Sequence, residues 1–239
     1  MNSSHTRGSL ALGICIALGL VLMGAVLGQS ALRIKGLERT VTVKGLAERE
    51  VPSDRALWPV AFTDAANDLG TLYASLDAKT ETVTAFLLGR GFEREEITVS
   101  PPAITDKLAQ QYGGDTGVAL RFTARQTVTV YSTKIDLVRA AQSEVSELGR
   151  AGIAIVGDNY ESRTQYFFTG LNEIKPAMVE EATRNAREVA EKFARDSDSS
   201  VGKIKRATQG QFSITDRDQN NPHIKKVRVV STVVYYLSD

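Results

Sequence analysis

Hydrophobic and polar residues alternate along several stretches of the chain with the period of a β-strand. Short alternating runs predict strands at residues 40–43 and 56–63. The most regular alternation covers residues 118–130, where apolar side chains fall on one face and Arg and Thr side chains on the other. The remaining patterns predict extended segments at residues 95–99, 153–156, 165–168, 203–214 and 226–237. Gly45 is expected to interrupt the first strand, and Pro59 marks the second as an edge or bulged strand.

Three other stretches follow the period of a helix. The first begins at Leu69, where Asn67 or Asp68 can act as N-cap, and ends at Gly89 and Gly91. The second begins at the capping-box-like sequence of residues 133–136 and ends near Gly149. The longest helix covers residues 172–195, and its expected inward stripe consists of Ala182, Ala186, Val189, Ala190 and Phe193. Hairpins and crossovers alternate along this order of elements, which predicts an α+β fold with mixed sheets and packed helices.

An apolar segment precedes this pattern. Residues 10–28 contain no charged side chain, and as a helix they would span about 28 Å, close to the roughly 30 Å of a bilayer core. We therefore expect a transmembrane anchor at 10–28, a short cytoplasmic tail at 1–9, a tether at 29–39 and an ectodomain at 40–239. The alternative is a cleaved signal segment with secretion into the periplasm, although the length of the segment favours the anchor. Basic residues follow the segment as densely as they precede it, so charge does not decide its orientation.

Composition limits the chemistry of the predicted domain. The chain has 239 residues, 24% of them charged, and a net charge of +1, which gives no general attraction to nucleic acid. Its single cysteine, Cys15, lies inside the apolar segment. Structural disulfides, thiolate zinc sites and thiol redox chemistry are therefore excluded from residue 29 onward.

Individual candidate residues give weak signals. The domain has one histidine, His223, whereas a zinc site or a nucleophilic triad needs further partners. Ser200 and Lys203 match S-x-x-K, but no KTG sequence follows, and we expect a turn there. Residues 216–220 resemble the start of a calcium loop, but Asn221 replaces the glycine of its sixth position. We predict no catalytic, cofactor-binding or metal-binding residue and no enzymatic activity.

Two kinds of surface remain as candidate contacts. The loop at residues 107–117 and the polar turn at 216–223 are candidate binding segments, because loops often carry function. A basic sheet face could also meet an acidic partner or another subunit. Its residues are Arg121, Arg125, Lys225, Lys226 and Arg228.

Several motifs, in order, resemble those of the SIMPL-domain family. Residues 42–56 read TVKGLAEREVPSDRA, similar to the family's opening strand signature of roughly V-x-G-x-A, then V, then D-x-A. Gly91-Phe92 and the following Glu95 to Thr98 resemble the step after its first helix. Residues 122–130 resemble its central strand. Ala182, Ala186, Ala190 and Ala194 resemble its alanine-rich helix, and residues 201–204, which read VGKI, resemble its G-K-I strand. The resemblance covers about residues 38–237.

This resemblance implies an α+β fold and a location in the bacterial envelope. Similar members include periplasmic immunogenic proteins and proteins linked to oxidative-stress defence, and some members form ring-like homo-oligomers. The family has no established catalytic residues to carry over. We therefore expect a non-enzymatic inner-membrane protein that self-assembles into a homo-oligomer and supports envelope integrity or oxidative-stress defence. A binding module for a small envelope ligand or an envelope protein partner is the alternative.

Overall fold

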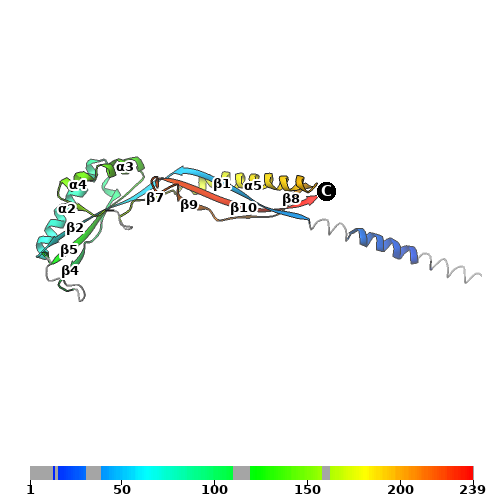
Figure 1. The fold of residues 1–239 in the computed structure, drawn as a ribbon, viewed down its shortest axis with the longest axis horizontal. Coiled ribbons are helices and arrows are strands. Elements are labelled where there is room, and N and C mark those ends of the chain that lie inside the picture. Colours follow the sequence, from blue (N-terminus) through cyan, green and yellow to red (C-terminus); the bar gives the residue numbers. More distant parts are fainter. Residues whose placement is uncertain (1–12, 14–15, 31–38, 110–118, 158–161, 239) are drawn as a thin grey trace, which may run out of the picture. The chain divides into compact units, whose positions relative to one another are not determined.

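The computed structural model describes residues 13, 16–30, 39–109, 119–157 and 162–238 (Figure 1). The chain divides into two compact units. Unit 1 consists of Met1–Glu48, Lys175–Phe212 and Arg228–Asp239, and unit 2 of Arg49–Ile174 and Ser213–Val227. Both contain antiparallel strands and helices, so the predicted α+β class is confirmed. The sheets are antiparallel, so the prediction of mixed sheets is wrong.

Unit 2 is built on a six-stranded sheet. Its strands are β2 (Arg55–Ala66), β3 (Ile97–Val99), β4 (Ala103–Asp106), β5 (Phe122–Ser132), β6 (Ala154–Ile155) and β7 (Gln165–Phe167). The long strands β2 and β5 pair antiparallel from Ala56 opposite Ser132 to Ala66 opposite Phe122. β3 and β4 pair with the other edge of β5, and β6 and β7 with the other edge of β2.

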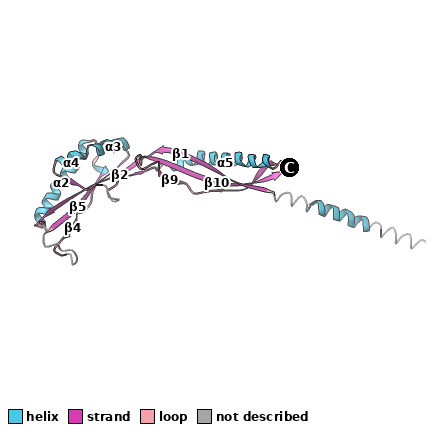
Figure 2. Cartoon of the chain, viewed as in Figure 1, coloured by secondary structure: helices cyan, strands magenta, loops and turns pink. Residues whose placement is uncertain are grey.

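Helices of unit 2 pack on the apolar face of this sheet (Figure 2). They are α2 (Leu69–Gly89), α3 (Ile135–Ser143) and α4 (Ser146–Arg150), with a 3-10 turn at η1 (Arg94–Glu96). As predicted, α2 begins at an Asp68 cap, whose side chain accepts a hydrogen bond from the Thr71 amide, and Gly91 follows its end with a φ of 99°. Leu72 and Leu76 of α2 join Val60 and Phe62 of β2 in the core.

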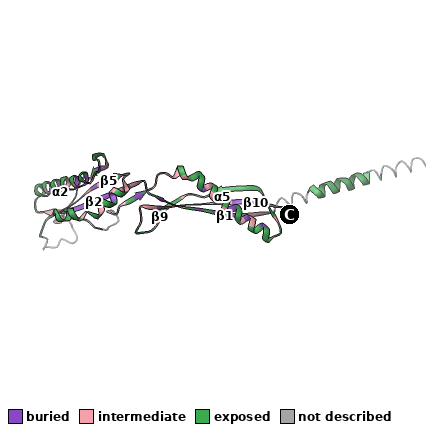
Figure 3. Ribbon diagram, turned by 90° about the horizontal axis from the view of Figure 1, so that it is seen from above, coloured by how far each residue is buried: buried purple, intermediate pink, exposed green. Residues whose placement is uncertain are grey.

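A second sheet has the strand order β1-β10-β8, with β9 also paired to β10. These strands are β1 (Thr40–Pro52), β8 (Ser200–Gln209), β9 (Ser213–Asp216) and β10 (Ile224–Ser238). Within unit 1, the helix α5 (Leu171–Asp196) contributes Ala186 and Ala190 to a core that includes Val43, Val233 and Tyr235. Figure 3 shows buried residues along β1 and β10, whereas much of α5 is exposed.

Tertiary packing overturns several local predictions in the strands. Gly45 does not interrupt β1, which continues through it to Pro52. Pro59 lies in the central strand β2, at a point between the stretches that pair with β6 and β7. A residue without an N–H is tolerated there because it faces a gap in the ladder. The predicted strand at 203–214 is divided into β8 and β9, with Gly210 between them. A Cβ at Gly210 would lie 2.6 Å from the carbonyl oxygen of Val230.

Two helix predictions also change. The helix predicted from residue 133 ends at Ser143 and is followed by the separate helix α4. Phe193 was expected to face inward but is 55% exposed. The buried stripe of α5 instead repeats at every fourth residue, which a helix keeps on one face. Its members are Met178, Ala182, Ala186, Ala190 and Ala194.

The N-terminal prediction falls partly outside the described residues. Residues 16–30 are helical, but residues 10–12, 14 and Cys15 of the predicted anchor are not described, nor are the predicted tail and most of the tether. Among the described residues, no helix is both long and apolar enough to cross a membrane. The predicted loop at 107–117 lies outside the described residues from position 110 onward.

Candidate functional site

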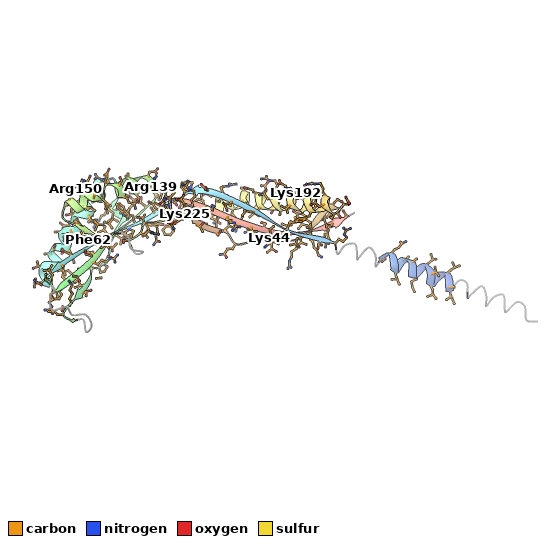
Figure 4. The ribbon with its side chains drawn as sticks, in the orientation of Figure 1. Lys44, Phe62, Arg139, Arg150, Lys192 and Lys225 are labelled. Atoms are coloured by element: carbon orange, nitrogen blue, oxygen red, sulfur yellow. The ribbon has the colours of Figure 1, made fainter. Side chains whose placement is uncertain are left out.

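A pocket of about 760 Å³ opens beside the turn between β9 and β10, within unit 2. Its wall combines Arg139 and Gln142 from α3, Tyr166 of β7 with Arg163 and Thr164 just before it, and most of the turn from Asp216 to His223. We call it the turn pocket; the position of Arg139 is labelled in Figure 4. The polar turn predicted as a binding segment therefore lines the pocket.

Asp218 holds the turn in shape. Its Oδ1 accepts hydrogen bonds from the backbone amides of Asn220 and Asn221, both at 2.9 Å. Its Oδ2 accepts one from Arg217 Nε at 2.8 Å. These bonds, that from Arg217 foremost, lower the pKa of Asp218 to about 2, so the carboxylate is ionised at neutral pH. Both of its oxygens thus serve the turn's own donors, an arrangement unlike that of a calcium loop.

A chain of hydrogen bonds forms the inner side of the pocket. The buried Tyr166 donates its hydroxyl hydrogen to Gln142 Oε1 at 3.3 Å. Gln142 Nε2 in turn donates to Thr164 Oγ1 at 2.5 Å. Burial raises the pKa of Tyr166, although the charge of Arg139 opposes this shift. The tyrosine is therefore neutral at physiological pH, and its amide partner is fixed in orientation.

His223 is held by its backbone and leaves its ring at the pocket. Its carbonyl oxygen accepts a hydrogen bond from the Ser53 amide at 2.8 Å. Its ring meets that of Tyr166 edge-on, with centroids 6.1 Å apart. Burial, and then the positive charges of Arg139 and Arg217, lower the pKa of His223. The imidazole is thus neutral at pH 7 and can donate and accept one hydrogen bond each.

The acidic residues in the wall and beside it differ in how they are paired. Asp216 accepts a hydrogen bond from Lys225, whose side chain is only 8% exposed. Asp136, beside the pocket on α3, is 3.6 Å from Arg139 and its side chain is 98% exposed. This second pair is therefore weak. Among the described residues, no group of three or more His, Cys, Asp or Glu side chains could hold a metal ion.

Other sequence candidates are placed apart from the pocket. Ser200 and Lys203 lie within β8 and not in a turn. Residues three apart on a strand face opposite sides, so they do not form a serine–lysine pair. Ser200 Oγ instead donates to the Ser238 carbonyl oxygen at 3.1 Å.

The predicted basic face is not a single surface. Arg125 lies on β5 and Arg121 directly before it, whereas Lys225, Lys226 and Arg228 lie on β10 of the other sheet. Arg121 forms an ion pair with Asp106 at 2.7 Å, and Lys225 is buried. The sequence pattern joined these residues because both strands alternate, and alternation does not reveal which strands share a sheet.

Sequence reasoning missed Arg139, Gln142 and Tyr166 as pocket residues. All three lie in segments that read as ordinary helix or strand, and none belongs to a motif. Of the pocket's segments, only the turn is indicated by the sequence, through its run of polar residues. The pocket depends on bringing α3 and β7 to that turn, which local patterns do not specify.

Comparison with known proteins gives one family match. The model of the SIMPL family, described as a protein of unknown function (DUF541), matches residues 41–233. The match runs from the second residue of β1 into β10 and so covers most of both units, but not the helix at residues 16–30. No curated protein matches the chain.

Proposed function

Because the chain belongs to the SIMPL family, we propose that it is a non-enzymatic envelope protein, anchored in the inner membrane, that self-assembles through β8. The observation that carries the proposal is the exposure of this strand. β8 has ten residues and none is buried. A strand of that length in a packed sheet normally buries one face.

β8 also lies at the end of its sheet. In the order β1-β10-β8, it is paired with β10 on one side (Figure 1). Its other edge presents backbone N–H and C=O groups that a further strand can pair with. Ile204 adds an apolar side chain that is 48% exposed. Because a two-fold contact uses the same surface on both partners, β8 of a second copy is the simplest partner.

An anchor at residues 10–28 would strengthen such assembly. Chains held in one membrane meet at a raised effective concentration, so a weak strand-to-strand contact becomes sufficient. The supporting observation is the apolar, helical segment at 16–30. A periplasmic position for the domain and a role in envelope integrity or oxidative-stress defence are part of this proposal. With no cysteine after residue 15, that role would not depend on ectodomain thiols.

Light scattering coupled to size-exclusion chromatography tests the proposal on the full-length protein in detergent. We expect a homo-oligomer that the substitution Ile204→Lys shifts toward monomer. Leu108→Lys is the matched control, since Leu108 is 73% exposed but lies in unit 2. A wild-type protein that stays monomeric at high concentration would overturn the proposal.

A second function is favoured by the turn pocket. The pocket has the size of small-molecule sites and places several polar groups around one space. A binding module for a small envelope ligand therefore fits this part of unit 2. The two functions are compatible, because β8 belongs to unit 1 and the pocket to unit 2.

A further inference from the structure

We propose that the turn pocket binds a small organic anion, with its carboxylate or phosphate group held by Arg139 and its body beside Tyr166 and His223. This inference deepens the second function above and rests on it. It does not depend on self-assembly.

The first argument is that the acidic side chains of the wall are already engaged. Asp216 is bound by Lys225, and Asp218 by Arg217 and by amides of its own turn. Neither carboxylate needs a bound cation to balance its charge. Because both carboxylates are already bound by protein donors, they do not favour a positively charged ligand.

The second argument concerns Arg139. It forms an ion pair with Asp136 at 3.6 Å, and the Asp136 side chain is almost fully exposed to solvent. Such a pair contributes little, so the guanidinium can exchange this carboxylate for that of a ligand at small cost. A guanidinium binds a carboxylate or phosphate through two parallel hydrogen bonds, which a water-exposed aspartate at this distance does not provide. Arg163 adds a second guanidinium to the same wall.

The third argument is the balance of charges around His223. Four charged neighbours act on its ring: Arg139 and Arg217 lower its pKa more than Asp136 and Asp218 raise it. Among these four charges, the two arginines therefore outweigh the two aspartates at the ring. An anion bound there would offset the two arginines and raise the pKa of His223.

The fourth argument is size. A pocket of about 760 Å³ is much larger than a single inorganic ion needs, and it lies within the range of organic ligand sites. One side of it carries the aromatic rings of Tyr166 and His223. A ligand with a planar apolar body and an acidic group matches both features better than inorganic phosphate does.

The experiment is an NMR titration of the histidine C2–H signal in the full-length protein in detergent. The chain has two histidines, and His223→Asn assigns the signal. The probes are phenyl phosphate, benzoate, inorganic phosphate and benzylammonium. We expect saturable shifts with phenyl phosphate or benzoate, a higher pKa of His223 in the bound state, and weaker binding of inorganic phosphate. The tighter of the two aromatic anions identifies the acidic group.

Arg139→Gln removes the positive charge and one of the two hydrogen bonds, while the amide can keep the other, so binding of the aromatic anion should weaken about tenfold. Arg150→Gln on α4 is the control and should leave binding unchanged, since Arg150 does not line the pocket. The proposal is overturned if benzylammonium binds in place of the anions, if no probe gives a saturable shift, or if Arg139→Gln binds like the wild type. Ile204→Lys in the same titration separates the two functions. We expect the monomeric variant to bind the anion like the wild type, which would show that binding does not depend on assembly.

Discussion

At the scale of single residues, Gly45 determines how closely α5 can lie on β1. A Cβ at this position would be 1.8 Å from the carbonyl oxygen of Ala182 and 2.5 Å from the backbone nitrogen of Ala186. Val43 and Ala47, two residues away on either side, are 3% and 1% exposed. The V-x-G-x-A signature is thus a contact surface for the helix backbone: its outer residues fill space, and its glycine leaves space.

Gly45→Ala should destabilise unit 1 by about 1–3 kcal/mol, the usual cost of overpacking a rigid contact. The clash is with backbone atoms, so no side-chain rotation can relieve it. Chemical denaturation followed by far-UV circular dichroism measures the change. Gly89→Ala is the control, because a Cβ at Gly89 meets nothing within 4 Å. Equal stability of the two variants would contradict the role assigned to Gly45.

Asp54 of the D-x-A signature has a different role at the same scale. Its Oδ2 accepts hydrogen bonds from the Thr169 amide at 2.8 Å, the Thr169 hydroxyl at 3.0 Å and the Gly170 amide at 3.2 Å. These donors stand directly before α5, which begins at Leu171. The aspartate of the signature thus connects the segment between β1 and β2 to the residues that precede α5.

Asp54→Ala should lower the free energy of unfolding by about 1–3 kcal/mol, because it leaves these donors without their charged acceptor. Asp136→Ala removes a carboxylate whose side chain is 98% exposed and serves as the matched control. Denaturant midpoints of both variants give the comparison. If Asp136→Ala costs as much as Asp54→Ala, the bonds to Thr169 and Gly170 do not stabilise the fold.

At the scale of elements, a charged contact fastens α2 to β2. Asp64 on β2 accepts a hydrogen bond from Ser75 Oγ at 2.5 Å and lies 2.8 Å from Lys79 Nζ, both on α2. Burial alone would raise the pKa of Asp64, but the hydrogen bonds from Lys79, Ser75 and the Ala65 amide together bring it below its usual value. The contact therefore depends on an ionised carboxylate.

The pH dependence of this contact follows from the lowered pKa. Its stabilisation is fully present above the unfolded-state value of about 3.8 and is lost as pH falls through the lower folded-state value. Asp64→Asn should be less stable than the wild type at pH 7, with the difference shrinking below about pH 4. Denaturation of both proteins from pH 7 to pH 2.5 measures this. A difference that stays constant with pH would show that the charge of Asp64 does not contribute.

Elements with complete local signals were predicted well. The Asp68 cap and the terminal glycines specify α2. The strand predicted from residue 118 begins only at Phe122, but from there its alternation correctly gives β5, because it matches a face covered by helices. Predictions failed where another part of the chain decides the outcome. Gly45 breaks a strand by propensity, yet α5 requires it within β1. Phe193 fits an apolar stripe by spacing, yet alanines fill the contact and leave it exposed.

The turn pocket was predictable only in part for the same reason. The polar turn at 216–223 stood out in the sequence, and it does line the pocket. Arg139 and Tyr166 gave no signal, because a helix surface arginine and a strand tyrosine are common. Their meeting depends on the packing of α3 and β7 in unit 2, which no local pattern encodes.

At the scale of the whole molecule, the predicted anchor should both hold the protein in the membrane and promote its assembly, and the two effects can be tested together. If the segment at 10–28 stays uncleaved, the membrane fraction should contain a chain of the full mass of 25.9 kDa. Removing residues 10–28 should release the protein into the soluble fraction and raise the concentration needed for oligomers, since the raised local concentration is lost. Fractionation, intact-mass measurement and light scattering give these three results.

A single substitution tests the membrane contact more sharply than the deletion does. Leu20→Arg places a charge near the centre of the segment, where insertion costs about 2.5–3.5 kcal/mol. It should therefore reduce the membrane-bound fraction, whereas Leu20→Phe keeps the segment apolar and should behave like the wild type. A mature protein whose mass lacks the N-terminal segment would instead identify that segment as a cleaved signal. Self-assembly would then depend on the contact at β8 alone. Ile204→Lys should in that case weaken assembly equally in the protein expressed with residues 10–28 and in the deletion variant.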